Sequence, residues 1–233
     1  MRAAIDQLSG ELRDRGPILE PGVGTGRMAL PMAAAGVDVI GLDLSVAMLG
    51  ELAAKSDGAG MVPVVRGDAT RLPFADGAFG GAYVVHLLHL VPGWADVVVE
   101  LARVVRRGGV VFVDAGSPGD RAMDEVNARF AEASGITRRH PGLWRIEEID
   151  PVMDGLGACL RLLPEIAVER RIPPERLIAR LEANLYSWTW PLDDATRLRA
   201  AAEVRTWAGE RFGTLDEPQP VTMSVAYRAY DLP

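Results

Sequence analysis

The stretch ILEPGVGTGRMALPMAAAGVDVIGLDL, residues 18–44, decides the fold class of this chain. It begins with an apolar pair typical of a buried strand, and residues 20–26 then place a glycine at every second position. Residues 27–35 have the composition of a helix, and residues 38–42 form a second apolar run that ends on Asp43. A strand, a glycine loop, a helix and a strand in this order, with a carboxylate at the far end, is the pattern of half of a nucleotide-cofactor site.

The loop glycines Gly22, Gly24 and Gly26 can adopt positive φ, and they let the backbone approach a ligand more closely than a Cβ would allow. Pro31 fits the following helix only if that helix begins near Arg27, because the N–H groups of the first turn need no partner within the helix. The sequence therefore predicts a helix N-terminus directly behind the glycine loop.

Two cofactors compete for this unit. Residues 24–29 match the dinucleotide pattern G-x-G-x-x-G/A, and Asp43 lies at a suitable distance to hold a ribose diol. A dinucleotide, however, places its pyrophosphate at this helix N-terminus, where the carboxylate of Glu20 would repel it. S-adenosylmethionine has no phosphate and carries a sulfonium, an ammonium and one carboxylate. The charge pattern therefore favours S-adenosylmethionine.

Four motifs in order resemble the class I S-adenosylmethionine-dependent methyltransferases, and among them the type-11 domain, the group that includes the ubiquinone- and menaquinone-pathway enzymes. The resemblance covers residues 16–115, and it is much weaker after Ser117. The motifs are Glu20-x-Gly22-x-Gly24-x-Gly26, the strand end at Asp43, Gly67-Asp68-Ala69 with Leu72-Pro73-Phe74, and the segment LARVVRRGG at residues 101–109.

The resemblance implies roles for individual residues. The glycine loop would pass the methionine part of S-adenosylmethionine, with Glu20 near its positive end, and Asp43 would hold the ribose diol. Asp68 would accept the adenine amino group, although a loop-capping aspartate is the alternative. Met48 is equally well a contact of the adenine or a core methionine. The full set assigned to the cofactor is Glu20, Gly22, Gly24, Gly26, Asp43, Leu44, Met48, Asp68 and Ala69.

A histidine follows the predicted fourth strand, residues 80–85, at the point where open α/β sheets place their reacting groups. His86 is the candidate general base toward a substrate hydroxyl or amine. Packing against cofactor or substrate is the alternative, because methyl transfer from a sulfonium depends mainly on in-line positioning. We expect His89 to be structural and Asp114 to face the edge of the substrate cleft.

The whole chain, residues 1–233, is predicted to be a single α/β domain with a doubly wound, seven-stranded, mostly parallel sheet whose last strand is antiparallel. A helical cap is expected within residues 117–157 and 172–212. Further strands are predicted over 61–65, 110–113, 160–168 and 221–230, and a helix over 94–106 is expected to end at Gly108-Gly109. Aromatic residues in the cap region either line an apolar substrate pocket or attach the cap; they are Trp144, Tyr186, Trp188 and Trp190.

Composition narrows the function. A net charge of −7 and a pI near 5.1 argue against nucleic acid as a partner. Cys159 is the only cysteine, which favours a reducing compartment. No apolar leader or membrane-spanning run is visible, so we expect a cytoplasmic protein without a membrane partner. The scattered histidines and single cysteine predict no metal site.

The predicted function is methyl transfer from S-adenosylmethionine to a small-molecule acceptor. Two alternatives remain open: a nicotinamide-dependent oxidoreductase, and a non-catalytic protein that senses S-adenosylmethionine. The acceptor and the oligomeric state cannot be predicted. Similar proteins usually carry further N-terminal residues that fold over the cofactor, so either the entrance is open here or part of the natural N-terminus is absent.

Overall fold

A computed structural model of the chain describes residues 2–56, 62–114 and 121–233. The chain divides into two compact units. The first comprises residues 1–116, 141–166 and 225–233, and the second comprises residues 117–140 and 167–224. The segments that form each unit are therefore interleaved along the sequence.

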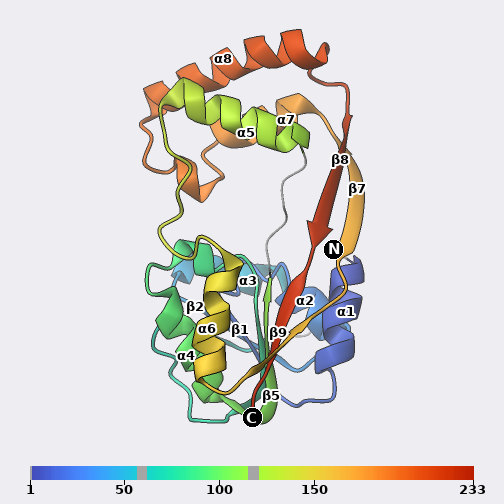
Figure 1. The fold of residues 1–233 in the computed structure, drawn as a ribbon, viewed down its shortest axis with the longest axis vertical. Coiled ribbons are helices and arrows are strands. Elements are labelled where there is room, and N and C mark those ends of the chain that lie inside the picture. Colours follow the sequence, from blue (N-terminus) through green and yellow to red (C-terminus); the bar gives the residue numbers. More distant parts are fainter. Residues whose placement is uncertain (1, 57–61, 115–120) are drawn as a thin grey trace. The chain divides into compact units, whose positions relative to one another are not determined.

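The first unit is built on one seven-stranded sheet with the order β3-β2-β1-β4-β5-β9-β6 (Figure 1). All pairs from β3 to β5 are parallel, and β9 is antiparallel to both of its neighbours. This confirms the predicted doubly wound, mostly parallel sheet with an antiparallel last strand. The strands are β1 (Ile18–Pro21), β2 (Val39–Asp43), β3 (Val64–Arg66), β4 (Phe79–Val84), β5 (Val105–Asp114), β6 (Cys159–Leu162) and β9 (Tyr227–Asp231).

Helices cover both faces of this sheet, because its strands carry apolar side chains on both sides. Ile18 packs into the core on one face and its neighbour Leu19 into the core on the other, and both are fully buried. One face is covered by α1 (Arg2–Leu12), α2 (Ala29–Ala34) and α3 (Val46–Lys55), and the other by α4 (Trp94–Val104) and α6 (Asp150–Gly155) (Figure 1). Short 3-10 turns span Leu88–Leu90 and Ile146–Ile149.

The helix after the glycine loop begins at Ala29, two residues later than predicted, and Pro31 lies in its first turn as expected. The prediction that Gly108-Gly109 ends the next long helix is wrong. The helix α4 ends at Val104, and both glycines lie inside β5, which begins at Val105. A change in the register of β5 against β4 accompanies them, between the partners of Phe79 and Gly81.

Two predicted strands are each divided. The predicted strand over 160–168 separates into β6 and β7 (Ile166–Ile172), interrupted at Pro164, which lacks the N–H that a ladder needs. The predicted strand over 221–230 separates into β8 (Gln219–Val225) and β9 around Ala226. The strands β7 and β8 pair with each other as a two-stranded sheet. The predicted strand over 61–65 is observed at Val64–Arg66, and Met61 lies outside the described residues.

The second unit has its own apolar core. Its helices are α5 (Arg121–Ser134), α7 (Pro174–Glu182) and α8 (Asp194–Phe212), with a 3-10 turn at Ser187–Thr189. Phe130 and Trp188 pack edge to face within this core, with ring centroids 5.9 Å apart. The helices predicted for the cap thus form a unit of their own, except that residues 141–157 belong to the first unit. A single domain with a cap stays a prediction.

Candidate functional site

The glycine loop lies at the carboxyl edge of the sheet, between β1 and α2. Gly22, Gly24 and Gly26 all have positive φ, of 70°, 54° and 78°, so the expected backbone conformation is confirmed. A Cβ at Gly22 would lie 2.8 Å from Leu87 Cδ1, whereas a Cβ at Gly24 would meet nothing closer than 3.9 Å. Gly24 is therefore required for its conformation, and its Cα faces open space that a ligand can approach.

Asp43, the last residue of β2, fixes this loop. Its Oδ2 accepts a hydrogen bond from the Gly24 amide at 2.8 Å, and its Oδ1 accepts one from the Ser45 amide at 2.8 Å. Ser45 in turn caps α3, because its Oγ accepts from the Met48 amide at 3.4 Å. The carboxylate that the sequence assigned to a ribose diol therefore also braces the glycine loop. Each of its oxygens keeps a second lone pair for a ligand.

Glu20 is buried in β1, with 3% of its surface exposed, and the Tyr83 hydroxyl donates to its Oε2 at 2.6 Å. Tyr83 lies in the neighbouring strand β4 and is fully buried. Burial raises the pKa of Glu20 to about 8, against the opposing effects of the Tyr83 hydrogen bond and the positive charge of Arg27. Burial and the adjacent Glu20 also raise the pKa of Tyr83.

The raised pKa changes the charge argument for the cofactor. At neutral pH the Glu20 carboxyl holds a proton, so it carries no negative charge with which to repel a pyrophosphate. A cofactor with a sulfonium and an ammonium nearby would favour the ionised form, because an opposite charge lowers the pKa of a carboxyl. The choice between the two cofactors therefore needs support beyond the sign of the charge at residue 20.

Asp68 follows β3 and is exposed. Its Oδ1 accepts from the backbone amide and from the hydroxyl of Thr70, both at 2.8 Å, and these hydrogen bonds lower the pKa of Asp68. This is the loop-capping role that the sequence left as the alternative. Within the described part of the chain, Oδ2 takes no hydrogen bond, so one carboxylate oxygen stays open to a ligand. Ala69 beside it is 8% exposed and packs in the core.

Two side chains of α4 hold the segment that follows Asp68. Glu100 Oε2 accepts from the Leu72 amide at 2.8 Å, and Arg103 donates to the carbonyls of Leu72 and Phe74 at 3.1 Å and 2.9 Å. Glu100 and Arg103 also pair with each other at 2.8 Å. The loop that carries Asp68 is therefore anchored on the adjacent helix.

Apolar side chains are exposed around the end of β2. Leu44 is 64% exposed, Val46 60% and Met48 39%. Met48 is therefore no core methionine, which removes one of its two interpretations. Large apolar side chains next to a braced polar loop suit the face of a flat ligand.

His86 follows β4 and is tied to Asp114, the last residue of β5. The His86 amide donates to Asp114 Oδ1 at 3.2 Å, and the ring Nδ1 lies 3.3 Å from Asp114 Oδ2. The His86 side chain is 53% exposed and that of Asp114 16%. Burial raises the pKa of Asp114, and the His86 ring opposes this shift. The backbone of His86 has a φ of 55°, which is uncommon for a residue with a Cβ.

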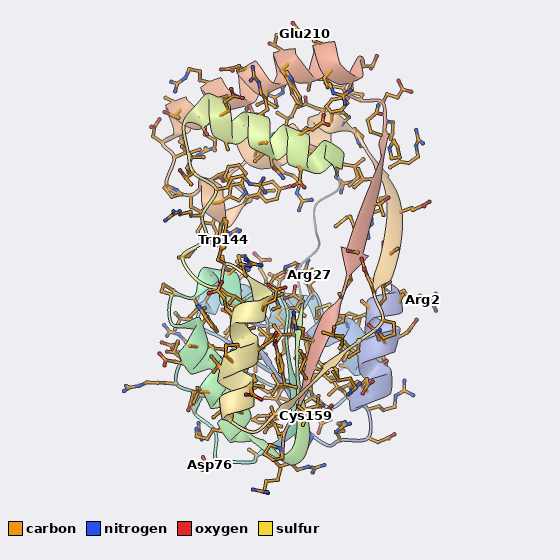
Figure 2. The ribbon with its side chains drawn as sticks, viewed as in Figure 1. Arg2, Arg27, Asp76, Trp144, Cys159 and Glu210 are labelled. Atoms are coloured by element: carbon orange, nitrogen blue, oxygen red, sulfur yellow. The ribbon has the colours of Figure 1, made fainter. Side chains whose placement is uncertain are left out.

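Sequence reasoning missed three members of this edge of the sheet: Tyr83, Arg27 and Tyr227. Tyr227 is buried and pairs with Asp114 in the ladder between β5 and β9, and burial together with Asp114 raises its pKa. The positive charge of Arg27 acts on Glu20, Asp114 and Tyr227. Figure 2 shows Arg27 at the end of the sheet opposite Asp76. No ion pair of Arg27 occurs within the described residues.

The aromatic residues proposed for a substrate pocket belong to two different units. Trp188 is 5% exposed and lies in the core of the second unit, where Tyr186 stacks on it with centroids 6.4 Å apart. Trp144 belongs to the first unit, and Trp190 is 58% exposed. For Trp188 the structure therefore supports the packing interpretation.

No three His, Cys, Asp or Glu side chains gather as metal ligands in residues 2–56, 62–114 and 121–233. In the same ranges, none of the helices combines the length and the apolar character that crossing a bilayer requires.

Known methyltransferases are similar to this part of the chain. A model of the methyltransferase domain matches residues 19–113. The chain is 36% identical over 127 residues to phosphatidylethanolamine N-methyltransferase of Cereibacter sphaeroides, which covers 52% of this chain and 62% of that protein. It is 36% identical over 112 residues to demethylmenaquinone methyltransferase of Beutenbergia cavernae, and this match covers 48% of this chain and 45% of that protein. The matches thus span roughly half of the length of these relatives.

A solved structure supports the fold. Phosphoethanolamine N-methyltransferase 2 of Haemonchus contortus, in complex with phosphomonomethylethanolamine and S-adenosylhomocysteine, superposes with a TM-score of 0.56 at 16% identity. The superposition covers 99% of this chain and 52% of that one. At this identity the likeness concerns the fold alone. The matched residues contain the glycine loop, Asp43, Asp68 and His86, and over residues 19–113 the chain is similar to the methyltransferase domain.

Proposed function

We propose that the protein transfers a methyl group from S-adenosylmethionine to a small-molecule acceptor. The observation that carries this proposal is the glycine loop held open by Asp43 at the carboxyl edge of the sheet, within the part of the chain that matches a methyltransferase domain. Ligands of open α/β sheets bind at this edge. The relatives named as methyltransferases support the reaction class.

The contacts described above support an assignment of the cofactor site. The glycine loop and the start of α2 receive the methionine part, with Glu20 beneath its positive end. Asp43 holds the ribose through its remaining lone pairs, and Asp68 accepts the adenine amino group with its open Oδ2. The exposed apolar side chains after β2 cover the adenine. The residues assigned to the cofactor are Glu20, Gly22, Gly24, Gly26, Asp43, Leu44, Met48, Asp68 and Ala69.

The acceptor approaches from the side of β4 and β5, where His86 is the candidate base. A net charge of −7 favours a small molecule over nucleic acid as the acceptor. The single cysteine, which is exposed and free, suits a reducing compartment such as the cytoplasm.

Thermal unfolding with added ligands tests the proposal. S-adenosylhomocysteine at about 100 times its Kd adds roughly 2.7 kcal/mol to the free energy of unfolding, a shift of a few degrees in Tm. NAD and NADP, added in parallel, are expected to give no shift. A shift with NAD or NADP alone would move the protein to the oxidoreductases, since residues 24–29 also match the dinucleotide pattern.

Two variants sharpen the ligand test. Asp43→Ala removes both the predicted ribose contact and the brace of the glycine loop, so it should abolish the shift. Asp38→Ala changes an exposed aspartate directly before β2, at the end of that strand opposite Asp43; it is the matched control and should leave the shift intact. Binding of S-adenosylhomocysteine without methylation of any acceptor in a broad panel would instead support a sensor.

A further inference from the structure

Asp114 restrains both the backbone and the ring of His86, whereas a single ion pair would restrain the ring alone. One carboxylate contacts both the backbone amide and the ring Nδ1 of the same histidine, at 3.2 Å and 3.3 Å. The contact joins residues 28 apart in sequence, at the ends of the adjacent parallel strands β4 and β5. The positive φ of His86 is strained for a residue with a Cβ, so the surrounding structure must hold the residue in place.

This arrangement selects one form of the neutral imidazole. An ionised carboxylate beside Nδ1 attracts an N–H and repels a lone pair, so the arrangement favours the proton on Nδ1. The other ring nitrogen, Nε2, is then unprotonated and available as a base. Free neutral histidine favours the opposite tautomer, with the proton on Nε2. The groups facing Asp114 from other elements are Tyr227 on β9 and Arg27 after the glycine loop, and Arg27 favours its ionised form.

A base at this position matters for only some acceptors. A neutral amine attacks the methyl group with its lone pair and releases its proton afterwards, and a carboxylic acid is already ionised at neutral pH. A phenol, with a pKa of about 10 as in tyrosine, is a weak nucleophile until its proton is removed. An imidazole titrates close enough to neutral pH to take that proton as the methyl group moves.

We propose that Asp114 is a positioning residue that holds His86 as the Nδ1–H tautomer, and that Nε2 takes the proton from the hydroxyl of a phenol or enol acceptor. The acceptor oxygen forms a bond to the methyl carbon, and the bond between that carbon and the sulfonium sulfur breaks with its electron pair on sulfur. The products are the methyl ether, S-adenosylhomocysteine and a protonated His86, which passes its proton to water. This inference rests on the proposed methyl transfer.

The tautomer is measurable on the full-length protein without any acceptor. The chain has three histidines, so long-range ¹H–¹⁵N spectra resolve each ring, and His86→Gln assigns its signals by their loss. In spectra recorded at about pH 8.5, His86 is expected as Nδ1–H in the wild type. In Asp114→Asn this preference should be lost, while His89 and His140 stay unchanged. A wild-type His86 that carries its proton mainly on Nε2 overturns the proposal.

The acceptor class is tested with phenol, with 4-nitrophenol, which ionises without a base, and with ethanolamine. Asp114→Asn should lower kcat for phenol about 100-fold, the usual contribution of general base catalysis, and leave KM for S-adenosylmethionine unchanged. The rate with 4-nitrophenol should change by less than about threefold, because no proton has to be removed. Equal losses with both phenols, or methylation of ethanolamine alone, would overturn the acceptor class.

Failure of the proposed function has a different signature. If S-adenosylhomocysteine does not stabilise the wild-type protein, the methyltransferase assignment is wrong whatever the tautomer of His86. If S-adenosylhomocysteine binds and the tautomer is Nε2–H, only the inference about Asp114 fails.

Discussion

Two loops at the carboxyl edge of the sheet, after β1 and after β4, both turn with positive φ and are both held by an aspartate, but they differ in the residue that turns. After β1 the chain turns with positive φ at glycines, where this conformation carries no steric cost, and Asp43 binds two backbone amides. After β4 the chain turns with positive φ at His86, where the conformation is costly, and Asp114 binds one amide and one ring. One carboxylate orders a backbone, and the other orders a titratable side chain.

This difference between the two loops matches two different tasks, binding a ligand and presenting a base. A loop that presents bare backbone to a ligand needs no side chain, so glycine is sufficient. A loop that presents a base must keep a side chain where glycine would be more stable, and strain of this kind collects at functional positions. Between the two loops lies the buried pair of Glu20 and Tyr83, one from each of the neighbouring strands β1 and β4.

The largest expected effect concerns this buried pair. The folded-state pKa of Glu20, about 8, lies above the ordinary value of 4.5, so between these values the folded state binds more protons than the unfolded state. Stability from this group is fully present below pH 4.5 and is lost as the pH rises toward 8. Relative to Glu20→Gln, the wild type should lose about 1.4 kcal/mol of unfolding free energy per pH unit in this window.

Urea unfolding of both proteins at a series of pH values measures this difference. Glu147→Gln changes an exposed glutamate and serves as the control, with a pH dependence close to that of the wild type. A constant difference between Glu20→Gln and the wild type from pH 5 to 8 would show that Glu20 is ionised in the folded protein, and would restore the charge argument against a dinucleotide.

The next effect compares the two aspartates directly. Asp43→Ala leaves two backbone amides without their acceptor and should cost about 2–3 kcal/mol of unfolding free energy. Asp114→Ala should cost less than about 1 kcal/mol, because the His86 amide and ring are both exposed enough to bind water instead and a desolvated carboxylate is removed. Equal costs, measured by urea unfolding at pH 7, would contradict the division between a structural and a chemical carboxylate.

The affinity for S-adenosylhomocysteine should also fall more in Asp43→Ala than in Asp114→Ala. Calorimetric titration with S-adenosylhomocysteine is expected to show at least a tenfold loss of affinity, about 1.4 kcal/mol, in Asp43→Ala. Asp114→Ala should stay within about twofold of the wild type, since Asp114 contacts a residue on the acceptor side. If Asp114→Ala weakens binding as much as Asp43→Ala, the two loops serve the same ligand.

The smallest effect isolates the strain at His86. His86→Ala and His86→Gly remove the same ring, but only glycine relieves the positive φ. We expect the glycine variant to be more stable than the alanine variant by about 1 kcal/mol, seen as a higher urea midpoint at unchanged slope. The control pair is Leu44→Ala and Leu44→Gly, at an exposed position that is not among the residues with positive φ, where alanine should be the more stable.

The sequence predicts most of the first unit because its signals are local. Continuous apolar runs mark buried parallel strands, and alternating glycines mark the loop before α2. The division at Ala226 leaves no comparable signal, because the alternation of apolar and polar residues runs on from β8 into β9. The pair Gly108-Gly109 suggested the end of a helix, but α4 ends earlier, at Val104. The strand β5 begins at the next residue, with no loop between the helix and the strand.

In the candidate site, too, the sequence predicts the local motifs but not the contacts between residues far apart in the chain. The cofactor residues lie in short motifs, so a family resemblance predicts them. The contacts from Glu20 to Tyr83 and from His86 to Asp114 join residues 63 and 28 positions apart. They follow only from the strand order, in which β4 lies between β1 and β5. Tyr83 could have been found by placing β4 beside β1, because it follows Ala82, the partner of Leu19, just as Glu20 follows Leu19.

The strand order also governs how the chain folds as it is synthesised. The strand β6 is attached to the sheet only through β9, and β9 is made of residues 227–231. Until these residues leave the ribosome, β5 presents an unpaired edge, although both segments of the second unit precede them in the chain. The α/β core is therefore finished last, and in a nascent chain stalled before residue 227 the edge of β5 stays open to pairing with another chain.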